Sequence, residues 1–247
     1  MFDAIADRYD FLNHLLSAGI DRRWRARAVR SLSLTGRERV LDLCTGTGDL
    51  AIAALAGYPR ASRVVGIDFA GAMLKIGASK IGARRLQDRI GLVRGDATRI
   101  PLADASVDAI TIGFGIRNVE SADTACAEMR RVLVPAGRIA VLEFAIPSAP
   151  GVRQLYSWYF NRLLPIVGRI VSRHRAAYTY LPASVGAFAS PDQFVTTLRN
   201  HGFVDVTAVP MTFGIVCLYT GHSGSATGSR GPGIRPKDDG PRESAPD

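Results

Sequence analysis

The sequence predicts an α/β fold with a seven-stranded, mostly parallel sheet and helices on both of its faces. Three observations support this prediction. Short apolar runs alternate with helical segments from about Arg39 onward, as they do in proteins built on parallel sheets. A glycine-containing turn joins the first of these runs to the first helix. With 247 residues, of which 47% are hydrophobic, the chain is long enough to bury one substantial core.

Seven apolar runs and four main helical segments follow one another along the chain. The predicted strands are Val40–Leu43, Arg63–Ile67, Ile90–Val93, Ala109–Ile112, Ile139–Leu142, about Val204–Val209 and Ile215–Tyr219. The predicted helices are Asp49–Ala56, Ala72–Ile81, Ala122–Leu133 and Pro191–His201. Pro135 and Gly137 are expected to end the third helix before the fifth strand. Ser190 is expected to cap the last helix and Gly202 to close it.

The chain is predicted to hold one domain and a tail. Residues 1–222 form the domain, with a helical cap at 1–34 and a helical insertion at 147–189 whose length suits a substrate cover. Of the last 25 residues, 223–247, 13 are glycine, proline or serine. Such a composition disfavours packed structure, so this segment is predicted to be a disordered tail.

The charge balance points to a negatively charged partner. The formal net charge is +9, and the tail contributes none of it because its four cations match its four acids. A basic body is attracted to nucleic acid, to an anionic membrane leaflet or to an acidic substrate. A basic stretch surrounds Trp24 in the predicted cap and consists of Arg22, Arg23, Arg25 and Arg27.

Cysteine usage and the first residues predict a cytoplasmic protein without a membrane span. Cys44, Cys126 and Cys217 are widely spaced and form no C-x-x-C pair, which argues against a disulfide framework and against a zinc site. No metal is therefore predicted. The segment Met1–Tyr9 carries acids where a secretory signal has a basic region, and no window reaches about 18 uninterrupted apolar residues.

The turn after the first strand has the composition of a ligand-binding loop. Gly46 and Gly48 lie where the backbone must come close to a ligand. Asp42 and Asp49 flank the turn with negative charge, which favours a cationic or neutral ligand over a pyrophosphate. Asp68 ends the second strand 22 residues after Gly46, a spacing that suits a contact to both hydroxyls of a ribose.

Together with Asp96 and Ala97, these residues predict S-adenosylmethionine as the ligand. Asp96 and Ala97 follow the third strand, where a carboxylate and a small side chain could receive an adenine. An adenosine that carries a sulfonium meets all of these demands. Structural alternatives stay open: the glycines serve only the turn, Asp42 caps a helix or joins a core network, and Asp68 caps the helix from Ala72.

Five segments of the chain resemble one known family. They are Met1–Arg25, Val40–Ala51, Gly95–Val119, Arg130–Pro147 and Tyr178–Phe194. They resemble the S-adenosylmethionine-dependent C-methyltransferases of ubiquinone and menaquinone biosynthesis, the UbiE/MenG type. The segments YDFLNHLLSAGIDRRW and FGIRNV narrow the resemblance to this quinone branch. Departures from the family pattern are Asp21 in place of a frequent His, Val134 and Ala136 within a usual K-P-G-G turn, and Gly113 in place of a common Ser.

The resemblance implies a Rossmann-like class I methyltransferase fold and a reaction. It implies that the enzyme converts demethylmenaquinol to menaquinol, methylates the equivalent ring of a ubiquinone precursor, or does both. It also implies that Thr47 with the glycine turn contacts the methionine part of the cofactor, Asp68 the ribose, and Asp96 with Ala97 the adenine. The glycine at position 113 is expected to weaken one cofactor contact.

Methylation of a ring carbon requires an electron-rich centre, which a hydroquinone supplies after one hydroxyl loses its proton. Arg117 follows the fourth strand and is the candidate that stabilises this phenolate, electrostatically or through a water, since its pKa is too high for a base. Asn118 could orient the ring oxygen, and Tyr9 could bind it or close the site. Alternatively, Arg117 pairs with Glu120 or another acid, and Tyr9 only packs.

No catalytic role is assigned to the four histidines, which show no paired acid at a recognisable spacing: His14, His174, His201 and His222.

A polyprenyl hydroquinone substrate implies peripheral contact with the inner face of a membrane. Residues 155–173 interleave aromatic and aliphatic side chains with Arg162, Arg169 and Arg173, as an interfacial helix pair would, or they cover the core.

Competing functions are a methyltransferase of another small phenol or lipid, an RNA-binding protein or RNA methyltransferase, and a nicotinamide-dependent oxidoreductase. The chain has no added RNA-binding module, so no nucleic-acid partner is predicted. A homodimer stays open.

Overall fold

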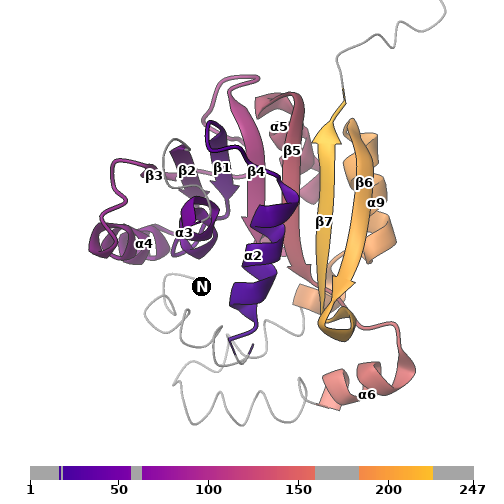
Figure 1. The fold of residues 1–247 in the computed structure, drawn as a ribbon. Coiled ribbons are helices and arrows are strands. Elements are labelled where there is room, and N and C mark those ends of the chain that lie inside the picture. The colour runs from indigo at the N-terminus through magenta and orange to yellow at the C-terminus, as the bar shows by residue number, and fades with distance from the viewer. Residues whose placement is uncertain (1–16, 18, 57–62, 159–183, 225–247) are drawn as a thin grey trace, which may run out of the picture.

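The computed structural model describes residues 17, 19–56, 63–158 and 184–224 (Figure 1). Within them lies one seven-stranded sheet with the strand order β3-β2-β1-β4-β5-β7-β6. Strands β1 to β5 pair in parallel, and β7 runs antiparallel to both β5 and β6. The predicted mostly parallel, seven-stranded sheet is confirmed.

The elements fall close to the predicted ranges. The strands are β1 (Arg39–Leu43), β2 (Arg63–Asp68), β3 (Ile90–Arg94), β4 (Val107–Gly113), β5 (Leu133–Phe144), β6 (Phe203–Met211) and β7 (Val216–Ser223). The helices are α2 (Asp21–Ser31), α3 (Asp49–Ala56), α4 (Gly71–Ala83), α5 (Ala122–Val132), α6 (Pro150–Trp158) and α9 (Pro191–Asn200). Two 3-10 turns lie at η1 (Ile116–Asn118) and η3 (Thr212–Gly214). Ser190 caps α9 in a capping box with Gln193.

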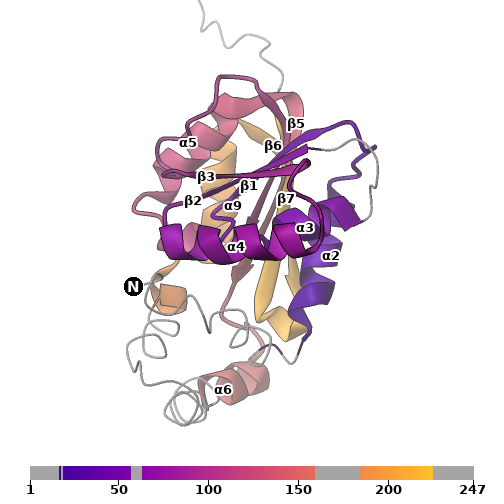
Figure 2. The same cartoon turned by 90° about the vertical axis from the view of Figure 1, so that its left-hand side faces the viewer.

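Helices cover both faces of the sheet (Figures 1 and 2). Successive residues of a strand point to opposite faces, so Val40 of β1 packs in the cluster that includes α2 and α3. Its neighbour Leu41 packs in the cluster that includes α5 and α9. Each aliphatic side chain buried in this way contributes about 1.5–3 kcal/mol to stability. The two apolar layers hold the sheet rigid, and the loops at its edges are positioned by it.

The junction between α5 and β5 differs from the prediction. Helix α5 ends one residue earlier than predicted, and β5 begins at once at Leu133. The ladder pairs Leu133 with Val107 and then Arg138 with Ala109, so residues 134–137 form a bulge. The proline and glycine that were expected to separate helix from strand therefore lie inside a strand. Local composition identified the irregularity, but it could not show that the strand continues on both sides of it.

The predicted peripheral segments are described only in part. The cap is represented by α2, and the insertion by α6 and residues 184–189. Residues 1–16, 159–183 and 225–247 lie outside the described residues, and Tyr9 is among them. Strand β7 runs through Ser223, which is buried, so the ordered sheet extends one residue past the predicted boundary at 222. None of the helices in the described ranges is long and apolar enough to cross a bilayer.

Candidate active site

A pocket of about 280 Å³ opens at the carboxyl ends of β1, β2 and β4. In an open α/β sheet this edge, beside the point where the strand order reverses, is where ligands bind. Six of the predicted site residues line the pocket: Gly46, Asp68, Asp96, Ala97, Gly113 and Asn118. The chain regions predicted to meet in one site are thus brought together. Further lining comes from side chains that were not predicted, among them Cys44, Phe69, Met73, Phe114 and Glu120.

The glycine turn follows β1 and forms one wall of the pocket. Gly46 and Gly48 have φ angles of 56° and 79°, a left-handed conformation that glycine adopts without steric cost. Helix α4 packs tightly against the turn, because a Cβ added at Gly77 would lie 3.2 Å from the carbonyl carbon of Thr47. Thr47 is buried and accepts a hydrogen bond from Lys80 Nζ at 3.0 Å. Thr47 and Gly48 shape the turn from outside the pocket lining.

Asp42 supports the turn and does not face the pocket. Its side chain is fully buried and accepts hydrogen bonds from Thr45 Oγ1 (2.5 Å), Thr111 Oγ1 (2.7 Å) and the Ala51 backbone N–H (3.1 Å). Burial raises the pKa of Asp42 to about 6, although these hydrogen bonds act in the opposite direction. Asp42 therefore belongs to a core network that fixes the loop, which is the alternative left open for it, and its assignment to the cofactor stays a prediction.

Of the acids that the sequence suggested, Asp68 and Asp96 line the pocket, whereas Asp42 and Asp49 do not. Asp49 is neutralised by an ion pair with Lys80 and by another with Arg25 at 3.2 Å. The third carboxylate in the pocket lining is Glu120, which was not predicted to lie there. Among the described residues, the lining contains no lysine, arginine or histidine. The pocket is thus electrostatically suited to a cation. Its negative charge comes from the lining and not from Asp49, which Lys80 and Arg25 neutralise.

Asp68 links the glycine turn to the start of α4. Its Oδ2 accepts a hydrogen bond from the Gly46 N–H at 2.7 Å, and its Oδ1 accepts one from the Ala70 N–H at 2.8 Å. Asp68 therefore does stabilise the start of the following helix, as the structural alternative proposed. It also lines the pocket, and because a carboxylate has about four acceptor sites, it can do both. Asp96 likewise accepts the Thr98 N–H at 2.8 Å.

Arg117 is held by a buried acid. Its Nη1 donates to Glu143 Oε1 at 2.6 Å and to the Phe114 carbonyl at 2.5 Å, and its backbone N–H donates to Glu143 Oε2. The Arg117 side chain is 5% exposed and that of Glu143 is fully buried. Asn118 Nδ2 donates to the same Phe114 carbonyl at 3.3 Å, and Asn118 lines the pocket. Arg117 itself lies behind the lining, paired with an acid other than the Glu120 that was considered.

Aromatic rings connect α2 to this arginine. The Trp24 and Phe114 ring centroids are 6.0 Å apart, and those of Phe114 and Phe144 are 4.6 Å apart. The Arg117 guanidinium lies 5.3 Å from the centroid of Phe144. Because Phe114 also lines the pocket, Trp24 of α2 packs directly against a side chain of the pocket wall.

Comparison with known proteins agrees with this architecture. The chain matches the ubiE/COQ5 methyltransferase family over residues 1–223. It belongs to this family. The ubiquinone/menaquinone biosynthesis C-methyltransferase UbiE of Geotalea daltonii is 45% identical over 90% of this chain and 94% of that protein. The demethylmenaquinone methyltransferase of Thermus thermophilus is 44% identical over 90% of this chain and 99% of that protein. The resemblance inferred from the sequence is confirmed.

Solved structures resemble the fold at much lower sequence identity. A SAM dependent methyltransferase from Aquifex aeolicus has a TM-score of 0.58 at 16% identity and covers 80% of this chain and 88% of its own. Phosphoethanolamine N-methyltransferase 2 of Haemonchus contortus, in complex with S-adenosyl-L-methionine, has a TM-score of 0.62 at 12% identity. That match covers 82% of this chain and 53% of the other. These likenesses establish the Rossmann-like fold of this UbiE/COQ5 family member.

The family member contains functional candidates that sequence reasoning missed. Glu143 interrupts the apolar run of β5, and an acid inside a buried strand was a signal that it has a partner. His201 and His222 do have paired acids, Asp123 at 3.2 Å and Asp205 at 2.7 Å, which no sequence spacing revealed. Neither histidine lines the pocket.

Cys44 lines the pocket but is unsuited to act as a nucleophile. Burial, with the charges of Asp68 and Asp42 nearby, raises the pKa of its thiol well above the usual range. The thiol therefore stays protonated at neutral pH.

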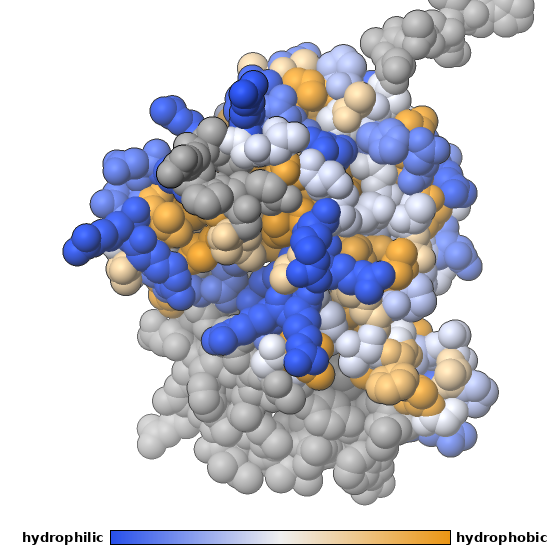
Figure 3. Space-filling view, in the orientation of Figure 1, coloured by the Kyte–Doolittle hydropathy of each residue, from blue (hydrophilic) through white to orange (hydrophobic). Residues whose placement is uncertain are grey.

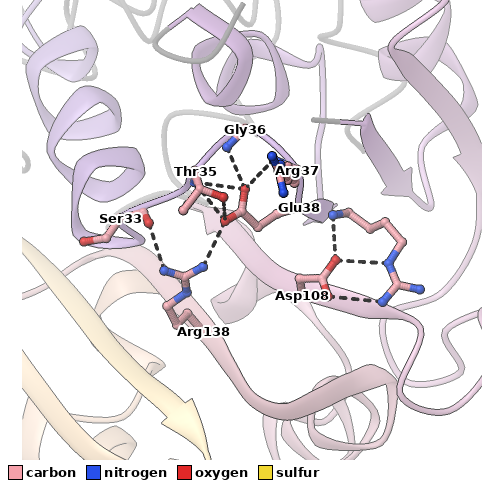
Figure 4. Close-up of polar contacts among 8 residues, drawn as sticks. Ser33, Thr35, Gly36, Arg37, Glu38, Asp108 and Arg138 are labelled. Atoms are coloured by element: carbon pink, nitrogen blue, oxygen red, sulfur yellow. Dashed lines mark hydrogen bonds and ion pairs between the residues drawn. The ribbon is translucent and has the colours of Figure 1, made fainter. Parts of the chain in front are cut away.

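The opposite edge of the sheet holds a polar cluster of another kind (Figure 4). A hollow of about 470 Å³ is lined there by Arg37, Glu38, Asp108, Arg138 and the bulge of β5. Glu38 accepts hydrogen bonds from the backbone N–H groups of Thr35 and Gly36, and Arg138 pairs with it at 3.3 Å. The polar groups drawn in this hollow bind one another.

Proposed function

We propose that this chain is an S-adenosylmethionine-dependent C-methyltransferase that converts demethylmenaquinol to menaquinol, methylates the equivalent ring of a ubiquinone precursor, or does both. The observation that carries the proposal is an acid-lined pocket at the ligand edge of a UbiE/COQ5 family member. The relatives from Geotalea daltonii and Thermus thermophilus, named for these reactions, match it over nearly their whole length.

The pocket suits the proposed cofactor electrostatically. S-adenosylmethionine supplies an electrophilic methyl group on a positively charged sulfonium. A unit charge about 4 Å from one carboxylate gains roughly 4 kcal/mol at an effective dielectric constant of 20, and the lining has three carboxylates. We assign Asp68 to the ribose, and Asp96 with Ala97 to the adenine. The turn at Gly46 and Thr47 is assigned to the methionine part of the cofactor. Thr47 lies outside the pocket lining, so it would act by fixing the backbone conformation of this turn.

The η1 turn is assigned to the ring of the acceptor. Bound S-adenosylmethionine would supply its methyl group to a ring carbon of the hydroquinone and leave as the demethylated sulfide, and the proton on that ring carbon would pass to water. Asn118 faces the pocket and can orient the ring oxygen. Arg117 lies behind it and is assigned to stabilise the phenolate; because Glu143 compensates its charge, the stabilisation would come from the fixed local dipole of this pair.

The lipid nature of the acceptor places the enzyme at a membrane. A polyprenyl tail belongs in the bilayer, so the protein is proposed to be cytoplasmic and to bind the inner face of the membrane peripherally. The segment first considered for this contact, with Arg162, Arg169 and Arg173, lies outside the described residues.

The reaction is tested with purified protein. S-adenosylmethionine and chemically reduced demethylmenaquinone are incubated with it, and mass spectrometry follows gain of one methyl group on the quinone head group. Calorimetry with S-adenosylmethionine and with its demethylated product measures cofactor binding separately. Cofactor binding without transfer to this acceptor, but with transfer to another small phenol or lipid, would replace the proposed substrate. Absence of cofactor binding by folded protein would refute the proposal as a whole.

A further inference from the structure

The outer face of α2 carries four arginines that no described acid neutralises. Arg22, Arg23, Arg27 and Arg30 are exposed, whereas Trp24 and its neighbours on the inner face are buried. At 3.6 residues per turn, the four lie within an arc of about 140°. None of them forms an ion pair with another described residue, unlike Arg25 on the inner side. Figure 3 shows hydrophilic side chains gathered over α2 in the centre of the view.

An exposed aromatic side chain lies in a turn that contacts α2. Phe213, at the tip of the β6–β7 connection, is 80% exposed. Thr212 and Phe213 have φ angles of 46° and 59°, a left-handed conformation that is costly for residues with side chains. The turn is nevertheless tied down, because Trp24 Nε1 on α2 donates to Thr212 Oγ1 at 2.8 Å. The strained backbone therefore holds an apolar ring in solvent next to α2.

The Phe213 turn and the part of α2 around Trp24 lie at the edge of the sheet where the pocket opens, whereas the carboxyl end of α2 leads to Ser33 at the opposite edge. Strand β6 runs in the same direction as β5, since each is antiparallel to β7, so the connection at Phe213 follows the carboxyl end of β6. Ile146, which is 44% exposed, follows the carboxyl end of β5. On the inner side, Trp24 contacts Phe114 in the pocket wall.

We propose that α2 and the Phe213 turn form the surface by which this protein binds an anionic bilayer. The four arginines would lie against lipid phosphates, and Phe213 and Ile146 would enter the headgroup region. A bilayer supplies negative charge and an apolar phase together, which this pairing of side chains requires. Nucleic acid supplies the charge, but it offers no apolar phase to an aliphatic side chain such as Ile146. The surface rests on the proposed function in one respect, because it places the pocket next to the lipid that would deliver the acceptor.

Vesicle sedimentation of the full chain tests the surface directly. The probes are vesicles of phosphatidylcholine alone and of phosphatidylcholine with phosphatidylglycerol. Binding is expected only to the anionic vesicles, and added salt should weaken it. Equal binding to the neutral vesicles would overturn the proposal.

Two variants and a control locate the contact. The quadruple variant R22Q/R23Q/R27Q/R30Q should lower the partition coefficient on anionic vesicles by at least about tenfold, since each arginine near the surface contributes about fivefold at most. F213S, which does not alter charge, should lower it about threefold to tenfold. The control R37Q/R63Q/R84Q/R99Q removes the same net charge at exposed positions elsewhere and should stay within about twofold of the wild type. F213S keeps the test valid if the quadruple α2 variant does not fold.

Equal loss in the α2 variant and in the charge-matched control would overturn the proposal. Preferential retention of a short RNA duplex by the wild type, in competition with anionic vesicles, would assign the face to nucleic acid instead. Assays of methyl transfer distinguish failure of the proposed surface from failure of the proposed function. The α2 variant should lose activity on a long-chain acceptor in vesicles and keep it on a short-chain acceptor in solution. A wild type that methylates neither acceptor would refute the proposed function, while vesicle binding would still decide the surface.

Discussion

Strand β5 carries two Arg–Glu pairs, one directly after its bulge and one near its carboxyl end, and the two differ in distance and in exposure. After the bulge, Arg138 pairs with Glu38 at 3.3 Å, and its side chain is 33% exposed. At the carboxyl end, Glu143 pairs with Arg117 at 2.6 Å, and both side chains are almost completely buried. The first pair lies in a cluster whose groups bind one another, whereas the second supports the wall of a pocket.

The difference separates acids that hold the fold from acids that face a ligand. Burial acts to raise the pKa of Glu38, but hydrogen bonds from Thr35 and Gly36 outweigh it and lower that pKa to about 2. A hydrogen bond from Arg39 lowers the pKa of Asp108 at the same edge. At the carboxyl edge, the described lining of the pocket, which includes Asp68, contains no arginine or lysine. The amino edge should therefore govern stability, and the carboxyl edge should govern binding and turnover.

The largest expected effect is on turnover. Arg117→Ala should lower kcat by at least about a thousandfold and leave the Kd for S-adenosylmethionine within a few-fold, because the guanidinium of the Arg117–Glu143 pair is assigned to the phenolate and not to the cofactor. Steady-state kinetics and calorimetry measure the two quantities. Arg117→Ala leaves Glu143 buried without its partner, so the double variant R117A/E143Q is assayed in parallel.

The matched control is Arg138→Ala, in the other Arg–Glu pair of β5. It should lower stability and leave kcat per folded molecule unchanged, since Arg138 lies far from the pocket lining. Near wild-type turnover in R117A would remove Arg117 from the mechanism. A comparable loss of kcat in R138A would break the distinction between the two edges.

The next effect is on cofactor affinity. Asp68→Asn should raise the Kd for S-adenosylmethionine by about a hundredfold, since the variant loses a negative charge and one of two acceptors that fix Gly46 and Ala70. Asp108→Asn removes a carboxylate at the amino edge and should leave that Kd unchanged. Titration calorimetry on both variants gives the comparison. An unchanged Kd in D68N would exclude Asp68 from the binding site.

The amino edge should dominate acid stability. The pKa of Glu38 is lowered from 4.5 to about 2, so its contribution is present above about pH 4.5 and is lost as the pH falls toward 2. Asp42 acts in the opposite sense: its raised pKa gives a contribution that is present below about pH 4 and lost as the pH rises through 6. Glu38→Gln should therefore cost about 2 kcal/mol at pH 7 and much less near pH 3. Urea unfolding at both pH values measures this, and a pH-independent difference would contradict it.

Local patterns predicted most of the fold but only part of the site. Buried runs and turn residues are local, so all seven strands were predicted, and the bulge in β5 was missed because it depends on pairing with β4. Because Asp68, Asp96 and Asn118 each lie at or after the end of a strand, they were predicted to meet in one site, and all three line the pocket. Partners far apart in the sequence were not visible: Glu143 lies 26 residues from Arg117, and Lys80 lies 31 residues from the Asp49 it neutralises. Charge at a site depends on such partners, which only the folded chain reveals.

The smallest expected effect concerns Gly113, which lines the pocket. A Cβ at this position would lie 3.2 Å from Leu50 Cδ2, so a side chain fits only if Leu50 yields by a few tenths of an ångström. Gly113→Ser should therefore lower stability by under about 1 kcal/mol, while its hydroxyl improves cofactor affinity about twofold to fivefold. Gly113→Ala adds the same Cβ without the hydroxyl and should show the stability loss alone. Calorimetry that finds equal affinities for the two variants would mean that the hydroxyl makes no contact, and that the glycine reflects packing against α3.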